Sequence, residues 1–355
     1  MDECPRRACR STRQQALGHG ALEVARALRQ SIEVFTHIQS TRPADVVVCE
    51  TPTVDSGLVT VIIPMRNASL WIEHCLKSVL AQTHRNLEIF CVDDSSQDDS
   101  YDRVVKQFGK DRRLCAVRLR HRVGPYQIKN WILRAYARGR FVAMQDADDL
   151  SHPDRISAQI VWMARRRWRV SGTYVHQFYP EDVRPRFREN VEIRAHGYLH
   201  SLAVYTPVGA TRASCDFGAL LGNKKEYVAH HGSQIFDRST LLEFGGFDGH
   251  TWMGADTDLN WRLLRFADIG NVPEVLYFRR FHHDSLTRDP ATGHGSPPRR
   301  AYEKRRDAHQ QRIVQALARG ENVRVRQLCT ADLYHSDIEI AHIHTGFNLK
   351  ASGAP

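Results

Sequence analysis

The sequence contains no apolar run that approaches the roughly 20 residues a membrane-spanning helix needs. Residues 1–13 are polar and mixed in charge, and they hold no apolar stretch like that of a secretory signal. Although the chain has 8 cysteines, no two are spaced as CxxC, which argues against a zinc knuckle. Several of them lie inside apolar runs, as buried thiols in a reducing compartment do. We therefore expect a cytoplasmic protein that at most rests on the inner face of a membrane.

The composition suits a folded protein with acidic partners. Of the 355 residues, 42% are hydrophobic, which is enough for one large core or two smaller ones. The formal net charge is +10, and a basic chain attracts nucleic acid, an anionic membrane surface or a phosphorylated small molecule. Charge alone does not decide among these three classes of partner.

The hydrophobic pattern divides the chain into three parts. Residues 1–57 have apolar residues at helical spacing within 14–38 and then two prolines, which predicts an N-terminal helical extension. Residues 58–290 are expected to form the main domain, which consists of two halves, 58–150 and 151–290. Residues 291–355 include a basic helical stretch at 299–318 and predict a C-terminal basic extension.

Strands and helices alternate from residue 58 to residue 150. The expected strands are 59–63, 87–92, 114–119 and 140–144, and the expected helices are 68–82, 98–108 and 126–137. Such alternation predicts a Rossmann-like α/β fold with a mostly parallel central sheet flanked by helices. Further along, the pattern predicts helices at 152–167, 239–244 and 255–266 and a closing strand or pair of strands at 271–281. Residues 170–235 are harder to interpret, with hints of strand near 204–208 and a polar, loop-like stretch at 180–200, while residues 232–236 resemble a strand.

Polar residues cluster where three of these strands end, at 64–67, 93–98 and 146–149. Ligands of parallel α/β sheets bind beyond the carboxyl ends of the strands, so we expect one acid-rich site built by three loops. Within the second cluster, Ser95, Ser96 and Asp98 are expected to turn the chain and to cap the next helix, and Asp93 is expected to have a structural role.

The third cluster contains an Asp-x-Asp pattern directly after the apolar run 141–144. On extended backbone, residues two apart point to the same side, so Asp146 and Asp148 can both reach one hard cation, which prefers oxygen ligands. A buried strand that simply runs into a polar turn has the same pattern. The motif alone therefore does not distinguish a metal site from a turn.

Several further motifs follow in a fixed order. They are 78–83 with 86–88, Lys129-Asn130, Gly245-Gly246-Phe247-Asp248, Ala255-Asp256-Thr257-Asp258 and 280–287. Together with the three clusters, these motifs make residues 58 to about 290 similar to glycosyltransferase family 2. Each motif is weak by itself, and the resemblance rests on their order and spacing.

The resemblance implies the GT-A fold, with the helical extensions at both ends outside it. It also implies an inverting, metal-dependent glycosyltransferase. Such an enzyme moves a sugar from a nucleotide-sugar donor to a hydroxyl of a glycan or lipid-linked acceptor, as in bacterial-type surface polysaccharide synthesis. A UDP-linked donor is the first expectation, and thymidine and guanosine donors stay open. The sugar, the acceptor, the linkage and the oligomeric state do not follow from the sequence.

The resemblance also implies a divalent cation, Mn²⁺ or Mg²⁺, at the acidic motif. Asp148 would bind it between the phosphate oxygens, and Asp146 would lie near the ribose and the metal shell. Asp149 would contact the donor sugar or brace the loop. His282, three residues before Ser285, would complete the metal shell or donate to phosphate, although a lone histidine in a strand is often only packed.

Donor contacts are implied at five further positions. Asp94 would read the base, because its carboxylate can accept the imide N–H of uracil or thymine. Pro64 and Asn67 would lie against the base or ribose through backbone groups. Arg66 stands where the family often has an aromatic residue, so stacking there is in doubt and a cation near the phosphates is the alternative. Lys129 stands where an arginine is common and would offset phosphate charge as a point charge, unless it is a solvated helix lysine.

Asp256 is the general base that the resemblance implies. An acceptor hydroxyl that attacks the anomeric carbon must lose its proton as the new bond forms. The family usually has Glu-Asp here, whereas this chain has Ala255-Asp256, so the acceptor contacts of the missing glutamate are in doubt. Trp252 would stack on an acceptor sugar or simply pack. Asp258 and Arg262, four apart on one helix, are expected to form a structural ion pair.

Two other classes of function deserve comparison with this one. A nucleotidyltransferase could share the nucleotide-binding half, but it does not need Asp256 and usually has a glycine-rich phosphate loop, which does not follow the first strand here. A nucleic-acid-binding protein is suggested by charge alone. The motif-bearing loops are mostly acidic and do not interleave basic and aromatic residues, so no nucleic-acid partner is expected. The basic runs 165–169 and 299–306 predict solvated faces, or, as a sharper hypothesis, contact with anionic lipid headgroups.

Overall fold

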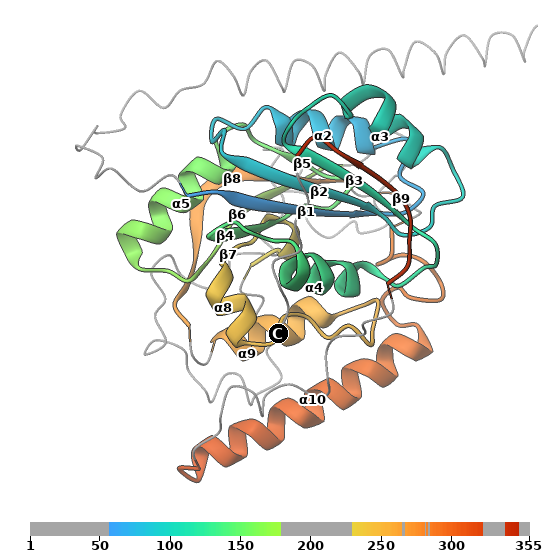
Figure 1. Cartoon of the computed structure of the whole chain (residues 1–355). Coiled ribbons are helices and arrows are strands. Elements are labelled where there is room, and N and C mark those ends of the chain that lie inside the picture. The colour runs from blue at the N-terminus through green and yellow to red at the C-terminus, as the bar shows by residue number, and fades with distance from the viewer. Residues whose placement is uncertain are drawn as a thin grey trace, which may run out of the picture. The chain divides into compact units, whose positions relative to one another are not determined.

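The computed structural model describes residues 57–178, 229–264, 267–280, 282, 285–321 and 338–347. The helix predicted within 14–38 and the strand hints near 204–208 lie outside the described residues. Figure 1 shows the described part of the chain as a twisted sheet with helices on both faces. The predicted α/β fold is therefore confirmed.

A parallel group of four strands forms the centre of the sheet. β1 (Val59–Met65) pairs with β2 (Leu87–Asp93) on one side and with β4 (Phe141–Met144) on the other, and β2 pairs with β3 (Leu114–Leu119). Every residue of β2 and β4 is buried, as expected of strands covered on both faces. These are the four strands predicted from the sequence, and β1 and β2 extend slightly further than expected.

Helices cover both faces of the parallel group. One core contains Val61 and Ile63 of β1 and residues of α2 (Ile72–Leu80), α3 (Ser100–Phe108) and α5 (Arg155–Arg166). The other contains Ile62 and residues of α4 (Pro125–Ala135), α8 (Arg238–Glu243) and α9 (Ala255–Leu264). Neighbouring residues of β1 belong to different cores because successive side chains of a strand point to opposite faces. In Figure 1, α2 and α3 lie above the sheet, and α4, α8 and α9 lie below it.

Beyond β4 the sheet becomes mixed. The order continues through β7 (Ile235–Asp237), β6 (Val170–Phe178), β8 (Ile269–Arg280) and β5 (Leu150–Ser151), and a single 3₁₀ turn, η2 (His231–Ser233), precedes β7. β6 runs parallel to β8, while β4 with β7, β7 with β6 and β8 with β5 are antiparallel. β8 is the closing strand predicted at 271–281. β6 was not predicted because its polar residues and its glycine interrupt the alternation of polar and apolar residues that is typical of a strand. Its strand conformation depends instead on pairing with β7 and β8.

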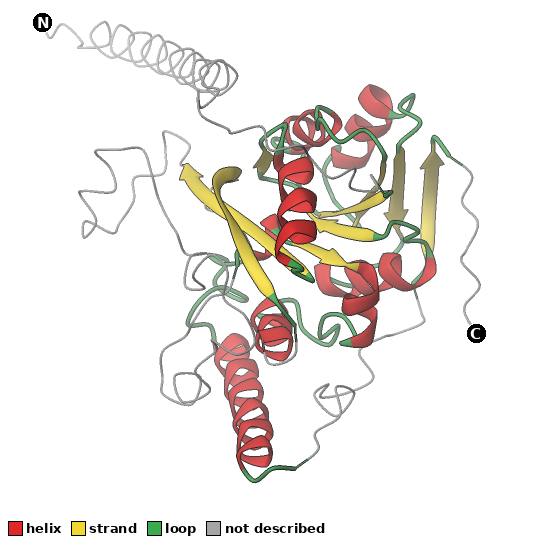
Figure 2. Cartoon of the chain, turned by 90° about the vertical axis from the view of Figure 1, so that its left-hand side faces the viewer, coloured by secondary structure: helices red, strands yellow, loops and turns green. Residues whose placement is uncertain are grey.

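The C-terminal part of the chain also joins this unit. β9 (Ile340–Thr345) pairs antiparallel with β3 and lies at the end of the sheet, where the sequence had no clear pattern. The predicted basic helix is α10 (Pro297–Ala318), which Figure 2 shows on the outer side of the helices below the sheet. Its Tyr302, Arg306 and Gln310 are buried, and the Arg306 guanidinium lies 4.8 Å from the ring of Trp261 in α9. One side of α10 is therefore packed, and only the other is solvated.

The predicted ion pair between Asp258 and Arg262 is confirmed. Arg262 Nε lies 2.9 Å from Asp258 Oδ2, and both side chains are buried. The same guanidinium donates to the carbonyl oxygens of Phe244 and Gly246, and Gln310 of α10 donates to Asp258 Oδ1 at 2.9 Å. This buried network connects α9 to the turn before it and to α10.

Three cysteines of the described residues are free thiols in the core, namely Cys75, Cys91 and Cys115. Burial raises the pKa of the Cys115 thiol to about 12, so it stays protonated and unreactive near neutral pH. Among the described helices, none combines the length and the apolar character that crossing a membrane requires.

Candidate active site

Three polar loops meet at one edge of the sheet. They follow β1, β2 and β4, which are adjacent and parallel in the order β4-β1-β2. The carboxyl ends of these strands therefore lie side by side. As the sequence predicted, the clusters 64–67, 93–98 and 146–149 belong to one edge.

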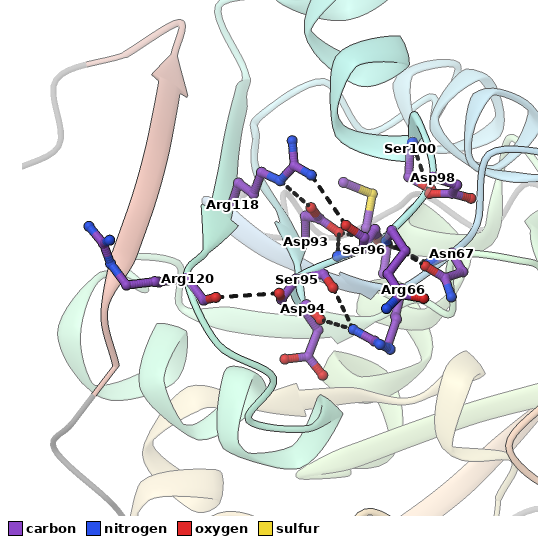
Figure 3. A network of polar contacts seen from close by, with 12 residues as sticks. Arg66, Asn67, Asp93, Asp94, Ser95, Ser96, Asp98, Ser100, Arg118 and Arg120 are labelled. Carbon is purple, nitrogen blue, oxygen red and sulfur yellow. Dashed lines mark hydrogen bonds and ion pairs between the residues drawn. The ribbon is translucent and has the colours of Figure 1, made fainter.

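Asn67 ties the loop after β1 to the loop after β2 (Figure 3). Its backbone N–H donates to Ser96 Oγ at 2.9 Å, and its side-chain Oδ1 accepts from the N–H of Gln97 at 2.9 Å. The residue has a φ of 47°, a left-handed conformation that asparagine tolerates better than most residues. Asn67 therefore holds the turn, and its predicted contact with a nucleotide stays a prediction.

Arg66 contributes to the same turn. Its Nη1 donates to the carbonyl oxygens of Asp94 and Ser95, at 2.7 and 2.5 Å (Figure 3). These bonds aim the guanidinium along the loop after β2. The predicted donor contacts of Arg66 and of Pro64, which lies in β1 opposite Val92, also stay predictions.

Asp93 has the structural role that was expected of it. The side chain is fully buried, and Oδ1 accepts from the N–H of Ser96 at 3.1 Å and from its hydroxyl. Arg118 Nε lies 3.3 Å from Oδ2. Asp98 holds the start of α3 in a similar way, because its Oδ1 accepts from the N–H of Ser100 at 3.1 Å.

Asp94, the predicted base reader, points to the opposite side and fastens another loop. Its Oδ1 accepts from the N–H of Val123 at 2.7 Å, and its Oδ2 accepts from the N–H of Gly124 at 3.0 Å. Burial raises the pKa of this carboxyl, and the two N–H groups partly offset that effect. Each oxygen has a second lone pair, so an additional donor such as a base N–H can still be accepted. Asp94 therefore also holds the loop before α4 in place, in addition to any contact that it makes with a ligand.

Lys129 is buried and lies beside Asp146. Only 1% of its surface is exposed, so the solvated-lysine interpretation is wrong. Its Nζ lies 3.9 Å from Asp146 Oδ1 and 2.8 Å from Nε2 of His231, which itself lies 3.2 Å from Asp146 Oδ1. Burial lowers the pKa of Lys129, and the charges of Asp146 and Asp256 act in the opposite direction.

Burial would raise the pKa of Asp146, but His231 and Lys129 outweigh it and hold that pKa well below its usual range. Asp146 is therefore a carboxylate at neutral pH. Two nitrogen groups face its Oδ1, and the Tyr277 hydroxyl accepts from its backbone N–H at 3.2 Å. Its predicted contacts with ribose and metal are not contradicted by this arrangement.

Asp148 and His282 form a second pair at the same edge. His282 Nε2 lies 2.8 Å from Asp148 Oδ2, while its Nδ1 is buried and has no hydrogen-bond partner. Among the described residues, no three His, Cys, Asp or Glu side chains are grouped closely enough to hold a metal by themselves. One carboxylate and one imidazole nonetheless fit a cation of the kind that takes one or two protein ligands and completes its shell with substrate phosphates and water.

Asp149 braces the loop, which was one of its two expected roles. The side chain is 2% exposed, Oδ2 accepts from the Tyr277 hydroxyl at 2.9 Å, and Oδ1 accepts from the backbone N–H of Arg280 at 2.7 Å. Burial raises the pKa of this carboxyl, with Asp148 and Asp146 adding to the shift. The alternative, a contact with the donor sugar, stays a prediction.

Asp256 lies in the first turn of α9, close to the same charges. The Tyr126 hydroxyl donates to its Oδ1 at 2.9 Å. Burial would raise the pKa of Asp256, but His231, Tyr126, Lys129 and Arg299 together lower it. The side chain is therefore ionised at neutral pH, which is the state in which a carboxylate can accept a proton.

Trp252 packs against the loop that Asp94 fastens. The Arg122 guanidinium lies 4.0 Å from the centre of the Trp252 ring, and Gly124 lies so close that an added Cβ would be 2.2 Å from Trp252 Cδ1. The ordinary packing that was considered for Trp252 is thus present. Stacking on an acceptor sugar stays a prediction for this residue.

Sequence analysis missed four residues of this site. They are Tyr126, His231, Tyr277 and Arg280, which hold Asp256, Asp146 and Asp149 through the bonds given above. A signal existed for Tyr126, because it stands three residues before Lys129 and so shares its helix face. No local signal existed for His231, which follows a stretch without clear pattern.

Comparison with known proteins identifies relatives of this chain. The model of a family described as glycosyl transferase family 2 matches residues 60–236. A glycosyltransferase of Rickettsia typhi is 33% identical over 249 residues, which are 65% of this chain and 66% of that protein. WfaP of Escherichia coli is named as a UDP-Glc:alpha-D-GlcNAc-diphosphoundecaprenol beta-1,3-glucosyltransferase. It is 37% identical over 125 residues, which are 35% of this chain and 48% of WfaP. The chain thus matches less than half of the length of WfaP.

A solved structure shares the fold. S. aureus TarS 1–349, in complex with UDP-GlcNAc, has a TM-score of 0.53 at 16% sequence identity, covering 76% of this chain and 69% of that one. The family match, the relatives and this likeness of fold agree with the order of the motifs along the sequence. The chain belongs to glycosyltransferase family 2, and its α/β domain has the GT-A fold.

Proposed function

We propose that this protein is an inverting, metal-dependent glycosyltransferase that moves a sugar from a UDP-linked donor to a hydroxyl of a glycan or lipid-linked acceptor. The observation that carries the proposal is the arrangement of the acids. Asp94 follows β2, and Asp146 and Asp148 follow β4, the two parallel strands on either side of β1. The Lys129 and His231 side chains that border Asp146 also interact electrostatically with Asp256.

These residues support a single displacement. The acceptor oxygen forms a bond to the anomeric carbon while the bond from that carbon to the donor diphosphate breaks, and the proton of the acceptor hydroxyl passes to Asp256. Attack from the side opposite the leaving diphosphate inverts the anomeric carbon. Lys129 and His231 provide donors near the departing phosphates, where negative charge grows.

Asp148, with His282 beside it, would hold the cation together with the donor diphosphate. When bound, such a cation offsets the charge that develops on the leaving group without a proton transfer. Asp149 keeps the loop of Asp148 in place through Tyr277 and the backbone of Arg280.

The name of WfaP supports the proposed donor and acceptor classes. That protein is named for a UDP-linked glucose donor and a diphosphoundecaprenol-linked acceptor. Over the matched segment, more than a third of the residues are identical in the two chains. Surface polysaccharide or related glycan synthesis is the process that we propose on this basis.

A donor screen tests the proposal. UDP-linked sugars are expected to raise the Tm when Mn²⁺ or Mg²⁺ is present, because a ligand that binds only the folded state stabilises it, by about 2.7 kcal/mol at 100 times its Kd. Differential scanning fluorimetry with uridine, thymidine and guanosine donors, each with and without metal, gives the comparison. A protein whose Tm responds to none of these donors would contradict the proposal.

We also propose that α10 contacts anionic membrane, where a lipid-linked acceptor would lie. Lys304 and Arg305 are exposed on α10, while Tyr302 and Arg306 on its other side are buried, so deleting the helix would disturb the fold. The variant Lys304→Glu/Arg305→Glu is expected to lower the binding constant for anionic vesicles at least about 30-fold, since two basic residues at about 1 kcal/mol each contribute about 2 kcal/mol. Vesicle sedimentation at about 0.1 M salt measures it.

The matched control is Arg165→Glu/Arg166→Glu, an equally charged and exposed pair at the end of α5. Because the run 165–169 is the other basic run for which lipid contact was considered, this variant also tests the choice of α10. It is expected to bind vesicles like the unmodified protein, and a loss of binding would assign the contact to α5 instead. Equal sedimentation of the α10 variant and the unmodified protein would defeat the membrane proposal and leave the transferase proposal untouched.

A further inference from the structure

Tyr126 connects the helix of Lys129 to the proposed base. Its hydroxyl donates to Asp256 Oδ1 at 2.9 Å, and among the described residues no hydrogen bond to the other oxygen, Oδ2, is found. Burial, with Asp256 next to it, raises the pKa of the Tyr126 phenol well above its ordinary value. The phenol therefore keeps its proton and acts as the donor.

The ring of Tyr126 has little freedom to move. It is 6% exposed and stacks on Phe247 with a centroid distance of 5.4 Å. Lys129 Nζ lies 5.4 Å from the ring centre, and the imidazole of His231 lies 6.3 Å away. These neighbours hold the ring from the turn before α9, from α4 itself and from η2, so the hydroxyl has one defined position.

The start of α4 is held as firmly as the ring. Asp94 accepts from the N–H groups of Val123 and Gly124, directly before the helix. Gly124 has a φ of 92°, a conformation that glycine adopts without strain, and it leaves no room for a Cβ against Trp252. Tyr126, the second residue of α4, is therefore placed by the strand end that carries Asp94 and by the segment that leads to Asp256.

We propose that Tyr126 is the positioning residue of the general base. By holding Oδ1, it limits rotation of the Asp256 carboxyl and leaves Oδ2 to meet the acceptor hydroxyl. The inference rests on the proposed function, in which Asp256 takes the acceptor proton. It adds that the segment fastened by Asp94 also sets the geometry of the base.

The substitution Tyr126→Phe tests this inference, because it removes the hydroxyl and keeps the ring on Phe247. The kcat is expected to fall about 10- to 100-fold, since a small misplacement of a catalytic group has an effect of that size. The KM for the donor and the Kd for UDP are expected to change less than about threefold, because the hydroxyl acts only in the transfer step. Steady-state kinetics at saturating acceptor, with calorimetry for UDP, measure both.

The matched control is Tyr136→Phe, which makes the same chemical change at the other end of α4. Tyr136 follows the helix and meets Trp131 edge-on at 5.2 Å, far from Asp256 along the helix axis. Its kcat is expected to equal that of the unmodified enzyme. A thermal unfolding scan of both variants verifies that each is folded.

A double variant separates positioning from an independent role. If Tyr126 acts through Asp256, the combination of Tyr126→Phe with Asp256→Asn is no slower than Asp256→Asn alone. A further loss by the full Tyr126→Phe factor, or an unchanged kcat of Tyr126→Phe itself, would overturn the inference alone. Full transfer by Asp256→Asn would instead overturn the base assignment on which the inference rests.

Discussion

The Asp148→Ala variant is expected to lose metal-dependent turnover of the donor by about 1,000-fold or more. A bound cation supplies several kcal/mol of charge stabilisation in the transition state, and about 4 kcal/mol corresponds to three powers of ten in rate. Asp148 is suited to this role because its carboxylate is partly exposed, with 28% of the side chain accessible, and its Oδ2 lies 2.8 Å from His282. Donor consumption with Mn²⁺ or Mg²⁺, and UDP binding with and without metal, measure the loss.

The fold should tolerate this substitution. Arg280 Nε donates to the backbone oxygen of Asp148, and alanine keeps that oxygen. The neighbouring Asp149→Ala is the control, because it removes a buried acceptor from the Tyr277 hydroxyl and from the N–H of Arg280. That variant is expected to lose about 2–4 kcal/mol of unfolding free energy. An Asp148→Ala enzyme that still binds UDP more tightly with metal than without it would disprove the assignment.

The Asp256→Asn variant is expected to bind donor normally and to transfer almost no sugar. Asparagine is close in shape and can still accept the Tyr126 hydrogen bond through its oxygen, but it cannot take up the acceptor proton. General base catalysis contributes about 10²- to 10⁴-fold, so the kcat should fall by about 10³-fold. The Kd for UDP should change by less than about threefold, because the loss lies in the chemical step. Product formation from donor and acceptor, with calorimetry for UDP, tests both statements.

Asp258→Asn provides the contrast on the same helix. Asp258 pairs with Arg262 and accepts from Gln310 inside the protein. Removing one charge of a buried pair costs about 3–5 kcal/mol of stability, so this variant should unfold at lower urea while its folded fraction keeps its kcat. Transfer at nearly the unmodified rate by Asp256→Asn would show that another group is the base.

Whether Lys129, at a position where an arginine is common, is solvated or buried follows only from the three-dimensional structure. In the sequence, Lys129 could be a solvated helix residue. In the structure it is enclosed by Tyr126 and Phe247, at 5.4 and 5.5 Å from their rings, and it faces Asp146 and His231. Burial of a cation is costly unless it is paired. The nearby carboxylate explains why a lysine is tolerated at this buried position. Its place beside Asp146 agrees with the role proposed for it, as a donor near the departing phosphates.

Asp94 illustrates a different limit of sequence reasoning. Its place at the end of β2, opposite Asp93, follows from the alternation of side chains along a strand. Its bonds to Val123 and Gly124 do not follow, because the loop before α4 is brought to Asp94 by the pairing of β2 with β3. Local patterns contain no information on such contacts.

The parallel strands β4, β1, β2 and β3, the helices between them and the acidic residues at their ends could all be derived from the amino-acid sequence, since each depends on a short-range period or on a motif beside it. Tertiary packing alone brought His231, Tyr126 and Arg280 to those acids and built α10 and β9 into the same unit. The physical reason is that burial and charge pairing act between atoms that are close in space. The chain brings these atoms together from positions that no local pattern relates.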